Sequence, residues 1–94
     1  SRFDIKILRK AYSLYYLSRY KEAINNANKL NKESDLAFIL IGNSLCKLSK
    51  YCESIKYFDK AIEINPNYSQ AYFNKGNSLE KLGKYDVAIK CYDK

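Results

Sequence analysis

Residues 35–68 read DLAFILIGNSLCKLSKYCESIKYFDKAIEINPNY, and a similar pattern begins again at Ser69. Residues 35–60 align without a gap with residues 69–94, and thirteen positions are identical, Gly42 and Gly76 among them. So many identities at one fixed spacing indicate an internal repeat. A period of about 34 residues is typical of arrays built from pairs of α-helices.

The spacing of large and small residues within the unit resembles the tetratricopeptide repeat. In residues 35–68 the matching positions are Phe38, Ile41, Gly42, Leu45, Ser54, Phe58, Ala61 and Pro66. In the next copy they are Tyr72, Lys75, Gly76, Leu79, Ala88 and Tyr92. The resemblance implies an all-α fold: an α-solenoid of about three helix-turn-helix repeats, whose six antiparallel helices form a right-handed superhelix.

We expect a single array over residues 1–94, made of a divergent repeat at 4–34, a complete repeat at 35–68 and a truncated repeat at 69–94. The first repeat aligns with the second when Asp4 is paired with Asp35 and Leu14 with Leu45, so it is the shorter of the two. The sequence ends inside a predicted helix, which indicates a fragment of a longer array.

Apolar residues that recur every three or four positions predict the helices. The expected ranges are 4–18, 20–32, 35–48, 51–64, about 68–82, and a sixth helix from residue 85. Ser34 is the expected N-cap of the third helix and Asn67 that of the fifth. Gly42 and Gly76 lie inside helices, where glycine costs about 1 kcal/mol relative to alanine, so we expect another helix to approach closely there.

The two helices of each pair are joined by a short turn in which Ser18, Ser49 and Gly83 occupy the same place. Glycine adopts a positive φ angle freely, whereas serine does not. The third turn should therefore be the least strained.

The composition argues against catalysis. The chain has no histidine, so the commonest general base is missing, and no phosphate-binding glycine loop occurs. Cys46, Cys52 and Cys91 show neither metal-ligand spacing nor an even count for disulfides. We therefore expect no enzyme activity, no cofactor and no metal site, and a reducing, cytoplasmic location. The longest apolar run, Leu36–Ile41, is too short to span a bilayer.

The resemblance implies that the first helix of each pair lines a concave groove. The groove residues expected from this projection are Leu8, Arg9, Tyr12, Tyr15, Tyr16, Leu36, Ile39, Leu40, Asn43, Lys47, Gln70, Phe73, Asn74, Asn77 and Lys81. Ile5, Cys46 and Glu80 complete the inward-facing positions. The groove would change from aromatic and apolar at its start to amide-rich at its end.

The function implied by the resemblance is a non-enzymatic scaffold that binds a peptide or helix segment of a partner protein in this groove. Some relatives hold a C-terminal acid with a two-carboxylate clamp, and Asn43 and Asn74 fall at its two asparagine positions. Ile39 stands where that clamp needs lysine, so generic peptide binding is the preferred interpretation.

Charge and exposed ends suggest two alternatives. The 17 Lys and Arg against 10 Asp and Glu give a net charge of +7, which favours an acidic partner or RNA, although a coding bias towards Lys, Asn, Tyr and Ile gives the same excess. Nucleic acid is the weaker candidate, because few cations project into the groove. The chain could also be a structural middle section that forms homodimers or stacks end to end, because Ile89 lacks a following helix.

Overall fold

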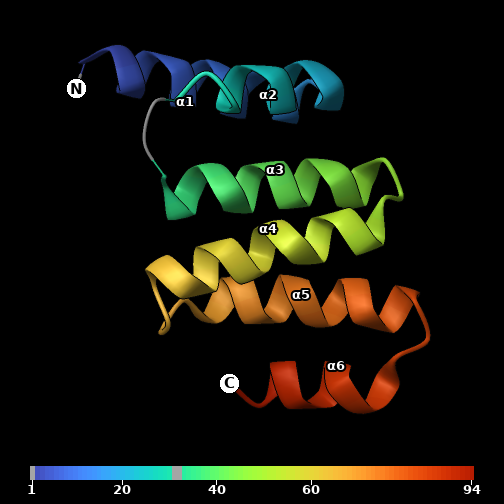
Figure 1. Ribbon diagram of the computed structural model, residues 1–94. Helices are drawn as coiled ribbons and strands as arrows, with labels where there is room; N and C mark the ends of the chain where they lie inside the picture. The colour runs from blue at the N-terminus through green and yellow to red at the C-terminus, as the bar shows by residue number, and fades with distance from the viewer. Residues whose placement is uncertain (1, 31–32) are drawn as a thin grey trace.

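The computed structural model describes residues 2–30 and 33–94, which form six helices and no strand. The helices are α1 (Arg2–Tyr16), α2 (Tyr20–Ala27), α3 (Asp35–Lys47), α4 (Tyr51–Ile64), α5 (Ser69–Lys81) and α6 (Tyr85–Tyr92). Figure 1 shows them stacked in chain order, with the two termini at opposite ends of the stack. The molecule measures 41 × 25 × 16 Å. The predicted all-helical solenoid is confirmed.

The helices form two layers, and the helices of one layer lie closer together than those of the other. Each helix packs against the next one along the chain, and α1, α3 and α5 also approach one another in succession. No such approach joins α2, α4 and α6 within the described residues. Since one layer is crowded and the other is spread, the stack curves, and α1, α3 and α5 line its inner face.

Three apolar clusters hold the helix pairs together, instead of one central core. Cluster 1 consists of Ala11, Ala27, Leu40, Ile41 and Leu45. Cluster 2 consists of Ile39, Phe58, Ala61 and Ala71, and cluster 3 of Leu79, Ala88 and Cys91. Because clusters 1 and 2 each join residues of neighbouring pairs, every pair depends on its neighbour for burial, as expected of a repeat array.

Each glycine inside a helix lies directly under an aromatic ring of the paired helix. A Cβ atom at Gly42 would lie 2.5 Å from Cε1 of Phe58, and one at Gly76 would lie 2.5 Å from Cε1 of Tyr92. Only a residue without a side chain permits this approach, so the expected reason for the two glycines is confirmed.

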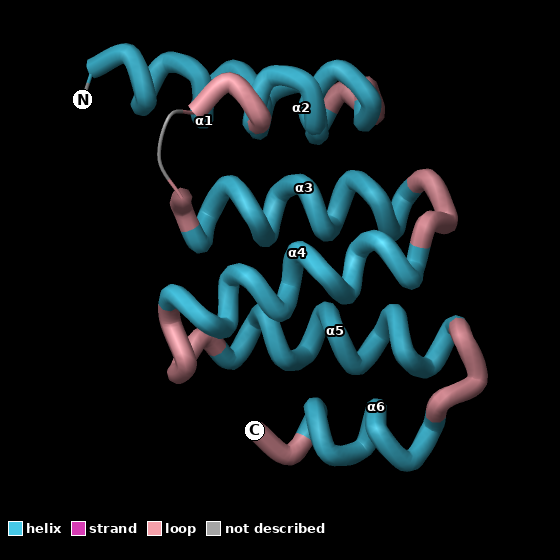
Figure 2. Tube along the Cα trace, in the orientation of Figure 1, coloured by secondary structure: helices cyan, strands magenta, loops and turns pink. Residues whose placement is uncertain are grey.

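The turn after each first helix follows the Schellman pattern. In the second pair, Ser49 N–H donates to Cys46 O at 2.9 Å and Lys50 N–H donates to Leu45 O at 2.8 Å. The other two pairs make the same bonds, and Figure 2 shows the similar short loops. The φ angles are 62° at Ser18, 60° at Ser49 and 78° at Gly83. The positive φ angle is thus adopted by two serines, where it costs energy.

Several predicted boundaries need correction. The first helix ends at Tyr16, not residue 18, because Ser18 takes the left-handed conformation that ends a helix. The second helix, predicted to reach residue 32, ends at Ala27, and residues 28–30 are not helical. Residues 31–32 of the predicted range lie outside the described residues. Ser34 is the N-cap of α3 as predicted and accepts from the Ala37 N–H at 3.3 Å.

The prediction that Asn67 caps α5 was wrong. The N-cap position is held by Tyr68, which makes no side-chain capping bond. The Tyr68 ring is instead partly buried against cluster 2.

The two glycines should differ in their tolerance of alanine. Phe58 is fully buried and cannot move aside, so Gly42→Ala should lower the free energy of unfolding by about 1–2 kcal/mol, the overpacking penalty less the gain in helix propensity. Tyr92 is 37% exposed and can shift outward, although this weakens its hydrogen bonds to Asn77 and Glu80, so Gly76→Ala should cost less than Gly42→Ala. Urea denaturation of both variants measures the difference. Equal losses would show that the mobility of the ring does not matter.

The strained turns predict a stabilising substitution. Ser49→Gly should raise the free energy of unfolding by about 0.5–1 kcal/mol, because glycine has no Cβ penalty at positive φ but loses more backbone entropy on folding. Gly83→Ser is the matched reverse change, since nothing lies within 4 Å of the Cβ that it adds, and it should destabilise by a similar amount. Thermal melts of both variants check the prediction. Shifts of the same sign would contradict it.

Candidate functional site

An open hollow of about 280 Å³ lies on the inner face where α1, α3 and α5 meet. Seven residues line it: Tyr15, Asn43, Cys46, Lys47, Gln70, Asn74 and Asn77. All seven belong to the inward-facing positions expected from the repeat pattern. Four of them carry side-chain amides, which can both donate and accept hydrogen bonds.

Two of these amides already bind each other across the inner layer. Asn74 Nδ2 on α5 donates to Asn43 Oδ1 on α3 at 2.9 Å. Within the described residues, Asn43 Nδ2 has no hydrogen-bond partner, and Asn74 Oδ1 accepts none. The pair therefore leaves one donor, Asn43 Nδ2, and one acceptor, Asn74 Oδ1, which are the groups that could bind a peptide carbonyl and a peptide N–H.

Tyrosines of α1 form the aromatic start of the inner face. The Tyr15 ring makes edge contacts with Tyr16 at 5.4 Å and Tyr20 at 5.5 Å between centroids. The Tyr12 hydroxyl donates to Leu36 O at 3.4 Å, a long hydrogen bond. Burial, assisted by neighbouring ionisable groups, raises the pKa of Tyr12 and of Tyr15. Both phenols therefore stay neutral hydrogen-bond donors at physiological pH.

At the other end of the inner face, Tyr92 of α6 reaches over α5. Its hydroxyl lies 2.7 Å from Asn77 Oδ1 and 3.0 Å from Glu80 Oε1. Partial burial and the hydrogen bond to Glu80 raise the pKa of Tyr92. The Tyr92 ring also lies 5.5 Å from that of Phe73, so α6 fixes both an aromatic and an amide group of the inner face.

Five further predicted groove residues do not line the hollow. Leu8 is half-buried, and Arg9, Tyr16, Leu36 and Lys81 are exposed. Tyr16 is the most open of them, with 78% of its surface accessible.

Ile39 and Leu40 do not line a groove, and that part of the prediction was wrong. They are only 3% and 1% exposed. Ile39 lies in cluster 2 with Phe58 and Ala61, whereas Leu40 lies in cluster 1. The helical projection placed them on the inner side, but neighbouring helices cover that side at both positions.

Beneath the hollow, a chain of hydrogen bonds joins α3, α4 and α5. The Ser54 hydroxyl donates to Tyr51 O at 2.7 Å and lies 2.9 Å from Ser78 Oγ, which in turn lies 3.0 Å from Cys46 Sγ. Because the Ser54 proton is used at Tyr51, Ser78 donates to Ser54 and the Cys46 thiol donates to Ser78. Sequence reasoning missed this chain, since its members lie 24 and 32 residues apart.

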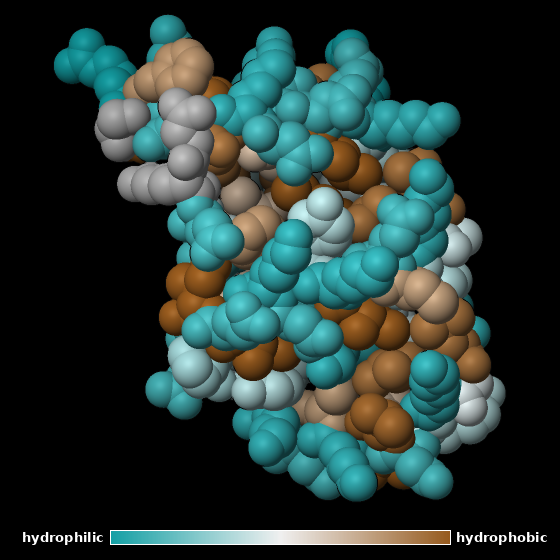
Figure 3. Space-filling model, viewed as in Figure 1, coloured by the Kyte–Doolittle hydropathy of each residue, from teal (hydrophilic) through white to brown (hydrophobic). Residues whose placement is uncertain are grey.

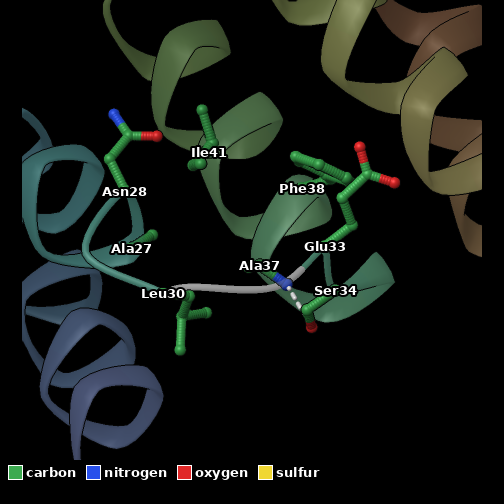
Figure 4. A pocket seen from close by; sticks show the side chains of 8 residues that line it. All are labelled: Ala27, Asn28, Leu30, Glu33, Ser34, Ala37, Phe38 and Ile41. Carbon is green, nitrogen blue, oxygen red and sulfur yellow. Dashed lines mark hydrogen bonds between the residues drawn. The ribbon is translucent and has the colours of Figure 1, made fainter. Parts of the chain in front are cut away.

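A second hollow lies at the seam between α2 and α3, as Figure 4 shows. Its lining comprises Ala27, Asn28, Leu30, Glu33, Ser34, Ala37, Phe38 and Ile41. The Ser34 hydroxyl in this lining is occupied by the cap of α3.

Two further properties bear on function. In the described part of the chain, no cluster of three or more His, Cys, Asp or Glu side chains could hold a metal ion. None of the helices there has the length and apolar character needed to cross a bilayer.

Comparisons with known proteins agree with this architecture. Two family models described as tetratricopeptide repeat match residues 37–68 and 57–90. No curated protein matches the sequence.

Solved structures of similar fold include three at low sequence identity. The second repeat domain of Spaghetti (RPAP3), bound to an HSP90 peptide, is 22% identical with a TM-score of 0.90, over 96% of this chain and 86% of that one. PcrH in complex with the chaperone-binding region of PopB is 14% identical with a TM-score of 0.92, over 97% and 76%. MamA is 22% identical with a TM-score of 0.90, over 96% of this chain but only 54% of its own.

The buried hydrogen-bond chain predicts coupling between two serines. Ser54→Ala should cost about 1 kcal/mol because it leaves Ser78 without its acceptor, and the double variant with Ser78→Ala should cost less than the sum of the two single changes. Ser44→Ala is the control, because that hydroxyl bonds within its own helix to Leu40 O and should add independently to Ser54→Ala. Urea denaturation measures the free energies of unfolding of the natural chain, the single variants and the double variant, which together form a double-mutant cycle. Additive losses for Ser54 and Ser78 would contradict the chain.

Proposed function

Because the chain belongs to the tetratricopeptide repeat family, we propose that it is a protein-interaction scaffold whose inner face binds an extended segment of a partner protein. The segment would lie across α1, α3 and α5 and enter the hollow that these helices form. The bond between Asn43 and Asn74 is the observation that carries the proposal.

The amide pair is suited to a peptide main chain. Asn43 Nδ2 would donate to a peptide carbonyl, and Asn74 Oδ1 would accept from a peptide N–H. Each such uncharged hydrogen bond contributes about 0.5–1.5 kcal/mol to binding. The pair therefore sets the position of the bound segment along the inner face more than it sets the affinity. The bonded groups of the partner belong to its main chain. The pair therefore selects for an extended backbone conformation and not for a particular amino-acid sequence.

Exposed rings next in sequence to residues that line the hollow would supply apolar contact. Phe73 is 56% exposed and Tyr16 is 78% exposed, and both lie on the inner layer. Rings in this position bury a large area of a partner side chain and lose little conformational entropy. We therefore propose a segment with apolar side chains that flank an extended stretch.

Charge would add a preference for an acidic partner. Lys47 is the one cation among the described residues that line the hollow, and the whole chain carries a net charge of +7. A carboxylate of the partner near Lys47 would be attracted at long range and screened by salt.

Two solved relatives support a protein partner. The RPAP3 domain binds an HSP90 peptide, and PcrH binds a region of PopB. The interaction function proposed here needs no catalytic group, and we propose a non-enzymatic role. The three free cysteines suit a reducing compartment such as the cytoplasm.

RNA remains the weaker candidate. Its backbone would need several cations along the inner face. The hollow offers amides and one lysine instead, which suits a neutral main chain better than phosphates.

Peptide selection tests the proposal. Peptides selected from a random phage-displayed library against the chain should shift the NMR side-chain signals of Asn43 and Asn74. Asn74→Ala should weaken their binding by about threefold to tenfold, as expected for one uncharged hydrogen bond. Fluorescence anisotropy of the selected peptides measures the loss.

Asn25→Ala serves as the control, because Asn25 is an exposed amide on α2, in the outer layer. It should leave affinity unchanged. Selected peptides that shift signals of α2, α4 and α6 and bind all variants equally would refute the proposed inner-face site.

A further inference from the structure

The inner face has two different edges, because its three helices run parallel. Figure 1 shows α1, α3 and α5 running in the same direction, with the turns that follow them on one side of the stack. Equivalent repeat positions near the starts of these helices hold Ile5, Leu36 and Gln70, which we call the uncharged edge. Equivalent positions at their ends hold Tyr16, Lys47 and Lys81, which we call the lysine edge.

Both edges are accessible to a partner. Ile5 is 58% exposed and Leu36 is 44% exposed, so the uncharged edge presents aliphatic surface. Lys47 lines the hollow, and Lys81 is exposed. Neither lysine forms an ion pair within the described residues, so both ammonium groups are available to a ligand.

The remaining charges of the inner face leave this contrast in place. Glu80 is the one acid at an inward-facing position of the described chain, and its Oε1 lies 3.0 Å from the Tyr92 hydroxyl. Arg9 lies between the two edges on α1. The inner face is therefore positive on balance, and its positive charge on α3 and α5 lies at the lysine edge.

The bonded amides lie between the two edges. Asn43 comes between Leu36 and Lys47 along α3, and Asn74 holds a similar middle place on α5. Leu36 and Lys47 are eleven positions apart, which corresponds to about 16 Å along a helix. This span leaves room for a bound chain with side chains on both sides.

An extended chain bound to these amides directs its side chains at the edges. Its main-chain N–H and C=O groups point at right angles to its side chains, and successive side chains point to opposite sides. When the main chain bonds to Asn43 and Asn74, the side chains therefore point along the helices. They point alternately toward the uncharged edge and the lysine edge.

We propose, resting on the inner-face function above, that the bound segment alternates acidic with apolar side chains. Acidic residues at every second position would meet Lys47 and Lys81, and the apolar residues between them would meet Ile5 and Leu36. Alternate residues of an extended chain lie about 6.6 Å apart, and packed helices lie about 8–10 Å apart. The long lysine side chains can bridge this difference.

Three short synthetic peptides with blocked ends test the pattern. One alternates valine and glutamate, the second has the same composition with the glutamates in one block, and the third alternates valine and glutamine. NMR titration gives the affinity and the site together. The alternating valine–glutamate peptide should shift the side-chain signals of Asn43 and Asn74 and bind about threefold to tenfold tighter than the other two, as expected for two exposed ion pairs.

The other outcomes separate the pattern from the site. Equal affinity for the two glutamate peptides would mean that only net charge matters, and equal affinity for the glutamine peptide would mean that charge does not matter. Either result, or no binding by the alternating glutamate peptide, overturns the pattern. The inner-face site itself is judged separately, by the peptides selected from the library.

Reversing the lysine edge should reverse the preference. The double variant Lys47→Glu, Lys81→Glu should bind the alternating valine–glutamate peptide more than about tenfold more weakly and should bind an alternating valine–lysine peptide instead. Figure 3 shows hydrophilic side chains over all parts of the face that it presents, between apolar patches, so the change in net charge needs a control.

Lys56→Glu, Lys90→Glu is that control. Both lysines are exposed at equivalent positions of α4 and α6 in the outer layer, and the double variant has the same net charge as the first. It should lose about threefold or less in affinity for the glutamate peptide, through the long-range field alone. Equal losses in the two double variants would overturn the proposed contact with the lysine edge.

Discussion

The contact between a glycine and an aromatic ring sets the helix packing in the second and third helix pairs. Because Gly42 and Gly76 have no side chain, Phe58 and Tyr92 lie against the backbone of the preceding helix. This fixes how close the two helices of a pair come, and therefore which of their side chains face the next pair. Cluster 2, which contains Phe58, and cluster 3, which joins α5 and α6, are packed at that spacing.

Local patterns were enough to predict the six helices, the Ser34 cap and the place of each turn. Depth of burial was not predictable in the same way. Ile39 and Leu40 lie on the inner side of α3 by their spacing, but contacts from helices distant in sequence cover them. The hydrogen-bond chain from Ser54 through Ser78 to Cys46 could not be predicted from the sequence either, because the repeat pattern indicates only that these positions hold small residues.

The inner face draws on first-helix positions that point away from the paired helix, such as Asn43 and Asn74. These side chains are free to differ between repeats, because the packing of the helix pair does not depend on them.

The unequal closeness of the two layers has a mechanical consequence. Tighter bending would press α1, α3 and α5 into one another, which close packing resists. Straightening would close the spaces of the outer layer and part the inner helices, and the bond between Asn43 and Asn74 is a tether against it. The solenoid therefore resists tighter bending through close packing and resists straightening through this hydrogen bond. A partner segment bound in the hollow would change both resistances.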